Sequence, residues 1–129
     1  MIDAWAQRYF EAWKTNDPAL VASLFTADAV YWYGPFREPA RGRDEIVRRW
    51  VENPPPADVR SAHEVIAVNG ETAVIHWRVS FEDTTMDGVL VVKLDAAGAC
   101  YEHREWYEAL QSATEVAGSG ERLTLAGDK

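Results

Sequence analysis

Apolar residues recur at intervals of three and four in three short stretches of the first half of the chain. This period predicts a helix over residues 3–15. Asp17 and Pro18 are residue types of a helix N-cap and first helical position, so a second short helix is expected to follow. A third helix is predicted over residues 44–52, where the run Asn-Pro-Pro-Pro ends it.

The rest of the chain alternates between apolar and polar residues, as strands do. Strands are expected at residues 29–33, 59–68, 72–82, 89–94 and 100–110. Asn69-Gly70 is a two-residue hairpin signal, and further turns are expected at Asp87-Gly88 and at residues 96–98. Helices followed by strands predict an α+β, cone-shaped fold, with three N-terminal helices packed on a curved antiparallel β-sheet. Residues 1–111 should form one domain, followed by a mobile tail at 112–129.

The two faces of the strand at 72–82 differ in character. The face that should meet the helices and leave a small-molecule cavity beneath them carries Ile75, Trp77, Val79 and Phe81. The opposite face is mixed and carries His76, Arg78, Ser80 and Glu82, with Trp106 on a neighbouring strand. We expect this second face to pair two subunits in a homodimer.

Composition narrows the range of partners. The net charge of −8 argues against nucleic acid, and no apolar run approaches the roughly 20 residues of a membrane span. Cys100 is the only cysteine, so no internal disulfide can form, and the first residues lack the pattern of a signal peptide. A cytoplasmic protein is therefore expected. Aromatic residues reach 12%, which favours either a large aromatic core or an aromatic-lined cavity.

The segment YEHREWYEAL at residues 101–110 carries the candidate chemistry. Alternation places Tyr101, His103, Glu105 and Tyr107 on one face of a strand. Glu105 is then either an acid or base in an apolar pocket, or a surface carboxylate paired with an arginine. In a pocket its pKa would rise toward neutrality, which suits general acid–base chemistry.

The loop FREPARGR, at residues 36–43, contains three arginines: Arg37, Arg41 and Arg43. We expect a solvated loop in which Glu38 neutralises one arginine. An anion-binding loop is the alternative.

Two long segments resemble a known family. They are QRYFEAWKTNDPALVASLFTADAVYWYGPFREPARGRDEI and GVLVVKLDAAGACYEHREWYE, and together they resemble the nuclear-transport-factor-2-like superfamily, above all its SnoaL-like branch. The resemblance extends over about residues 1–110. It implies the cone-shaped fold, on which isomerases, cyclases, epoxide hydrolases and non-enzymes are all built.

Particular positions resemble functional positions of that superfamily. Tyr9, in AQRYF, matches the tyrosine with which ketosteroid isomerases stabilise an oxyanion, whereas Tyr33 and Leu90 stand where those enzymes have aspartates. HREWYE resembles the final-strand motif of limonene-type epoxide hydrolases, and Glu105 takes the place of its acid. Those hydrolases add an arginine and a second acid on the middle strand, where this chain has Arg78 and Ser80.

Together the pattern and the resemblance predict a cofactor-independent enzyme. It would perform isomerase, cyclase or hydrolase chemistry on an apolar carbonyl or epoxide compound, and the alternative is a non-catalytic ligand-binding or dimerisation module. The predicted catalytic groups are Glu105, Tyr9 and His103. The residues predicted to bind a small apolar or aromatic molecule are Trp13, Trp32, Tyr33, Phe36, Trp77, Val79, Leu90 and Tyr107. No metal is predicted, because the three histidines are not spaced as zinc ligands are.

Overall fold

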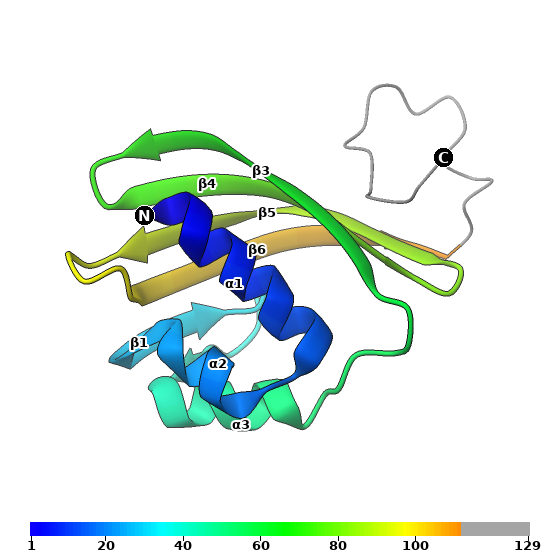
Figure 1. The fold of residues 1–129 in the computed structure, drawn as a ribbon, viewed down its shortest axis with the longest axis horizontal. Coiled ribbons are helices and arrows are strands. Elements are labelled where there is room, and N and C mark those ends of the chain that lie inside the picture. Colours follow the sequence, from blue (N-terminus) through cyan, green and yellow to red (C-terminus); the bar gives the residue numbers. More distant parts are fainter. Residues whose placement is uncertain (112–129) are drawn as a thin grey trace.

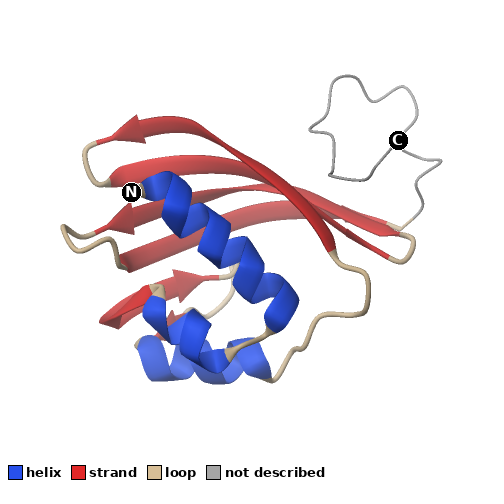
Figure 2. Ribbon diagram, in the orientation of Figure 1, coloured by secondary structure: helices blue, strands red, loops and turns tan. Residues whose placement is uncertain are grey.

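A computed structural model of the protein describes residues 1–111, and the predicted tail at 112–129 lies outside the described residues. The helices are α1 (Ile2–Thr15), α2 (Pro18–Ser23) and α3 (Arg43–Val51). The strands are β1 (Phe25–Trp32), β2 (Ala40–Arg41), β3 (Arg60–Asn69), β4 (Thr72–Phe81), β5 (Thr84–Leu94) and β6 (Cys100–Leu110). This order confirms the predicted α+β class, with the helices first and the long strands afterwards (Figure 2).

All the strands belong to one curved sheet with the order β2-β1-β6-β5-β4-β3 (Figure 1). The long strands β3 to β6 are joined by tight turns and run antiparallel to one another. However, β1 pairs with β6 in parallel, so the sheet is mixed rather than wholly antiparallel. Two parallel strands must be joined by a long crossover connection. Here the connection from β1 to β6 runs through β2, α3 and the strands β3 to β5.

The helices cover one face of the sheet, as the strand pattern predicts. Figure 1 shows α1 crossing the long strands, with α2 and α3 beside β1. Phe10 of α1 stacks on His63 of β3, and its ring lies 6.4 Å from that of Trp77 on β4. The indole of Trp5 donates a hydrogen bond to the Leu24 carbonyl at 3.0 Å, which ties α1 to the end of α2. Apolar burial against the sheet therefore holds the helical layer in place.

The predicted turn at Asp87-Gly88 is wrong, because both residues lie inside β5. The β4–β5 turn is formed instead at Glu82, whose φ of 52° is left-handed. Gly88 serves a different purpose. A Cβ atom there would lie 2.2 Å from the Trp106 carbonyl oxygen, so only glycine allows β6 to approach this closely. The Asn69-Gly70 hairpin, by contrast, is confirmed between β3 and β4.

The outer face of the sheet carries polar contacts across neighbouring strands. Asp87 receives a hydrogen bond from Arg78 at 3.0 Å and lies 3.1 Å from the His76 imidazole. Trp106 lies two strands away from His76 on the same face and is 42% exposed.

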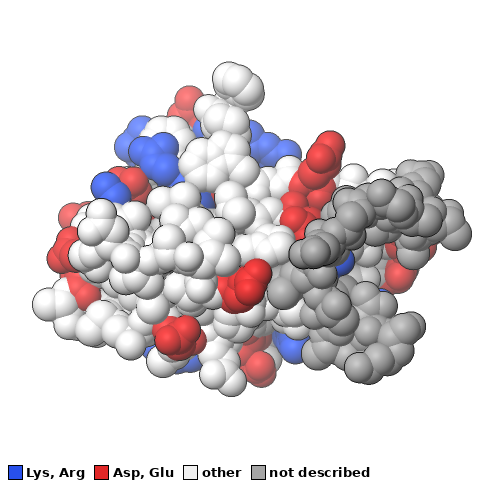
Figure 3. Space-filling view, turned by 90° about the horizontal axis from the view of Figure 1, so that it is seen from above, with Lys and Arg blue, Asp and Glu red and all other residues white. Residues whose placement is uncertain are grey.

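Seen from above, the molecule also shows broad uncharged areas between its charged side chains (Figure 3). Within residues 1–111 no helix is long and apolar enough to cross a membrane.

Candidate functional site

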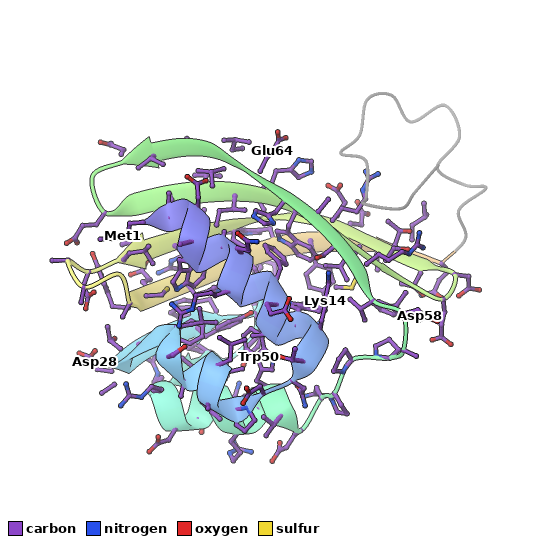
Figure 4. The ribbon with its side chains drawn as sticks, in the orientation of Figure 1. Met1, Lys14, Asp28, Trp50, Asp58 and Glu64 are labelled. Carbon is purple, nitrogen blue, oxygen red and sulfur yellow. The ribbon has the colours of Figure 1, made fainter. Side chains whose placement is uncertain are left out.

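A cavity of about 340 Å³ opens between the C-terminal ends of α1 and α3 and the strands β1 and β6. The aromatic side chains that line it are Trp13, Tyr31, Tyr33, Trp50 and Tyr107. Its polar lining consists of Asn16, Arg37, Arg49, Asn53 and Glu105. Trp50, labelled in Figure 4, reaches from α3 into the space beside β1. A concave lining that combines aromatic side chains with polar groups is typical of a small-molecule site.

Glu105 is the one carboxylate that lines this cavity among the described residues. Alternation along β6 turns it inward, and its side chain is only 7% exposed. The Tyr31 hydroxyl donates a hydrogen bond to its Oε1 atom at 2.8 Å. Burial raises the pKa of Glu105 from 4.5 to about 7, although the Tyr31 hydrogen bond and the Arg37 charge act in the opposite direction.

Behind Glu105 lies a buried chain of hydrogen bonds. The hydroxyls of Tyr31 and Tyr9 are 2.7 Å apart, and the Tyr9 hydroxyl lies 3.1 Å from Nε2 of His103. The Tyr31 ring also stacks on the His103 ring, with centroids 3.8 Å apart. Burial raises the pKa of both tyrosines and lowers the pKa of His103 to about 3. At neutral pH all three groups are therefore uncharged. Their hydrogen bonds hold the Tyr31 hydroxyl against the carboxyl group of Glu105.

Of the predicted catalytic groups, only Glu105 lines the cavity. Tyr9 and His103 are 1% and 0% exposed and lie one layer deeper, where they reach Glu105 only through Tyr31. Of the predicted binding residues, Trp13, Tyr33 and Tyr107 line the cavity.

The other predicted binding residues do not line the cavity. Trp32 is the last residue of β1 and follows the inward Tyr31, so it faces the other side of the sheet. There the Arg104 guanidinium stands 4.8 Å from its ring centre. Phe36 is 99% exposed in the loop after β1. The remaining three, Trp77, Val79 and Leu90, face inward and are buried in the core.

Trp77 approaches the cavity most closely of these three. Its ring lies 6.2 Å from that of Trp13 and 6.1 Å from that of Tyr107, so it supports two lining residues from behind.

Sequence reasoning missed Tyr31, the residue that contacts Glu105 directly. The signal was present, because Tyr31 and Tyr33 are two residues apart on one strand and so share a face. Arg37, Arg49 and Trp50 were also missed as lining residues, since their approach to β6 depends on how α3 and its preceding loop fold back. No group of three or more His, Cys, Asp or Glu side chains in residues 1–111 is arranged to hold a metal.

A curved sheet closed by helices around an aromatic cavity defines the class of cone-shaped α+β domains. The sequence profile of the SnoaL-like domain matches residues 6–103, and the chain belongs to this family, within the nuclear-transport-factor-2-like superfamily. No protein with a curated description matches the sequence.

Two solved structures illustrate the similarity of fold. One is a nuclear-transport-factor-2-like protein of unknown function from Mesorhizobium loti, with 22% identity, a TM-score of 0.65 and coverage of 82% of this chain and 89% of that one. The other is SalBIII, an epoxide hydrolase/cyclase-like enzyme in pyran ring formation in the polyether salinomycin. It has 15% identity, a TM-score of 0.68 and the same two coverages, 82% and 89%.

Proposed function

We propose that this protein is a cofactor-independent enzyme that uses Glu105 to transfer protons to or from a small molecule. The observation that supports this proposal is a carboxyl group, 7% exposed, at the wall of an aromatic cavity, with its pKa raised to about 7. A general acid or base works best when its pKa lies near the working pH, because both protonation states are then populated. Burying a carboxyl group costs free energy, so such a group favours a functional interpretation.

The surroundings of Glu105 suit proton transfer in either direction. The protonated acid can give its proton to a carbonyl or epoxide oxygen, and the carboxylate can take one from a carbon beside a carbonyl or from a hydroxyl group. Tyr31 occupies Oε1, whereas Oε2 has no hydrogen-bond partner in residues 1–111. That second oxygen is the one we assign to the substrate.

The substrates we propose are apolar, cyclic carbonyl or epoxide compounds. Five aromatic side chains line the cavity and offer flat surfaces for a ring. The reaction would be an isomerisation, cyclisation or hydrolysis, and SalBIII, which shares the fold, is described as epoxide hydrolase/cyclase-like. Tyr9 and His103 take a positioning role in this proposal, because each acts on Glu105 only through Tyr31.

The proposal is tested by titrating the side-chain carboxyl of Glu105 with ¹³C NMR, using the Glu105→Gln variant to assign the resonance. The expected pKa is near 7. Cyclohex-3-enone isomerisation and cyclohexene oxide hydrolysis then serve as activity probes, and Glu105→Gln should lower either rate by roughly two to four orders of magnitude. Glu102→Gln, on the opposite face of β6, is the control. An ordinary carboxyl pKa for Glu105 would refute the proposal.

A second candidate function is a non-catalytic ligand-binding module. It is favoured by the absence of a second carboxylate from the cavity lining within residues 1–111, so no acid–base pair is formed there. A ligand that binds with equal affinity to the wild type and Glu105→Gln, and is never converted, would favour this candidate.

We also propose that two copies pair through the outer face of the sheet. The large indole of Trp106, 42% exposed beside the polar contacts of His76, Arg78 and Asp87, supports this arrangement. Light scattering at micromolar concentration should give twice the mass of the chain, and a monomer would contradict the proposal.

A further inference from the structure

Arg37 differs from every other arginine in the described part of the chain. Its guanidinium makes no hydrogen bond, ion pair or ring contact with residues 1–111, although it lines the same cavity as Glu105. The others all have such a partner, and they are Arg8, Arg41, Arg43, Arg48, Arg49, Arg60, Arg78 and Arg104. The free guanidinium of Arg37 is therefore available to a ligand.

Two further hydrogen-bond donors, Arg49 and Tyr33, line the same cavity as Arg37. Arg49 is held by the Glu45 carboxylate at 2.8 Å and lies 5.7 Å from the ring centre of Tyr33. The Tyr33 hydroxyl is buried and has no hydrogen-bond partner among the described residues. Burial raises the pKa of this phenol to about 12, so it keeps its proton at neutral pH and can donate it to an acceptor.

The cavity lining has a net charge opposite in sign to that of the whole protein. The whole chain carries −8, yet two of the lining residues are arginines and one is a carboxylate. Glu45 balances Arg49, and Glu105 is only partly ionised at neutral pH. The positive charge of Arg37 thus lacks a full counter-charge at the cavity wall, and its planar fork of donors matches a carboxylate.

We propose that the ligand of this cavity is a flat, cyclic carboxylic acid whose carboxylate binds Arg37 and whose ring lies among the aromatic side chains. This deepens the proposed function by adding one carboxylate to the apolar ring compound proposed there. It rests on the proposed function only for the placing of the reacting carbonyl or epoxide group against Glu105. A single negative charge is favoured over a phosphate dianion. The helix ends at the cavity are the C-terminal ends of α1 and α3, and their partial negative charge opposes a second charge on the ligand.

The test compares 2-naphthoate with 2-naphthamide, which have nearly the same shape and differ in charge. Binding is followed by the quenching of tryptophan fluorescence, since Trp13 and Trp50 line the cavity. In wild type the naphthoate should bind about tenfold more tightly at low ionic strength, and salt should narrow this difference. Arg37→Gln should abolish the preference. Arg41→Gln is the matched control, because Arg41 lies over Trp32, outside the cavity lining. This variant should keep the preference for the naphthoate.

The outcomes separate this inference from the proposed function. The inference is overturned if wild type binds 2-naphthoate and 2-naphthamide equally well, or if Arg37→Gln still prefers the naphthoate. In either case a near-neutral pKa of Glu105 would still support the proposed enzyme. A preference that depends on Arg37, together with an ordinary Glu105 pKa, supports the inference and refutes the enzyme. If neither 2-naphthoate nor 2-naphthamide binds at millimolar concentration, the inference is wrong, and so is the proposal that the cavity binds flat ring compounds.

Discussion

Replacing Glu105 by glutamine should stabilise the fold at alkaline pH and leave its stability unchanged at acid pH. The pKa of Glu105 is raised to about 7 in the folded protein, from 4.5 for a free side chain. The difference corresponds to about 3 kcal/mol, because one pKa unit is worth about 1.4 kcal/mol. Since Glu105 is 7% exposed, solvent screens little of this amount.

The direction of the effect follows from proton binding. Below the unfolded pKa of 4.5 both states hold the proton, so the wild type suffers no penalty. Between that value and the folded pKa of about 7, the folded state keeps a proton that the unfolded state has lost, and stability falls as pH rises. Above it, the folded wild type carries the full cost of a buried charge. Glutamine never ionises, and its amide oxygen can still accept the hydrogen bond from Tyr31.

Urea unfolding, followed by tryptophan fluorescence between about pH 4 and pH 8.5, measures this difference. The advantage of Glu105→Gln should grow from near zero to about 3 kcal/mol across that range. Glu102→Gln, on the same strand but bonded to Arg104 at the surface, should show no gain at alkaline pH. A Glu105→Gln variant that is destabilised equally at every pH would refute the reasoning, because Glu105 would then be a structural hydrogen-bonding group rather than a desolvated acid.

Three further predictions concern neighbouring groups. Tyr31→Phe should raise the pKa of Glu105 above its value of about 7, because the hydrogen bond that favours the carboxylate is lost; ¹³C NMR measures this, and Tyr33→Phe is the control. Gly88→Ala should destabilise the protein by about 3 kcal/mol or more in urea unfolding, since its Cβ would lie 2.2 Å from a backbone oxygen. Trp106→Arg should halve the mass seen in light scattering, and an unchanged mass would exclude this tryptophan from the interface.

The order of the three helices and the five longer strands could be predicted from the sequence, because each of these elements has a strong local pattern. The two-residue strand β2 was missed, because it lies inside the predicted loop at 36–43. The helical period of α1 and the alternation of β4 both reflect one buried face, which needs no knowledge of distant residues. The Asp87-Gly88 error arose because a glycine serves turns and close backbone approaches equally well. The carbonyl of Trp106 on β6 is what requires Gly88 inside a strand, and that neighbour lies far along the chain.

The site could be predicted only in part, because alternation reveals a face but not a depth. Glu105 and Leu90 are paired on adjacent strands and both face inward, yet only Glu105 reaches the cavity. Tyr31 was missed although its partner Tyr33 was named, and Trp32 was named although alternation turns it to the other face. The position of the cavity depends on how far each helix extends over the buried face of the sheet. The sequence pattern of a single element does not determine this.

The two parts of the cavity are held in different ways. Glu105 and Tyr31 lie on paired central strands, and a buried chain of hydrogen bonds through Tyr9 fixes them. Arg37, by contrast, lies in the loop that follows β1, and its side chain makes no hydrogen bond or ion pair within residues 1–111. A sheet supports a proton-transfer group well because its geometry is rigid, whereas a loop tolerates substitution without disturbing the sheet. Changes in the loop can therefore alter which molecule is bound while the acid is kept, which fits a scaffold that hosts many unrelated activities.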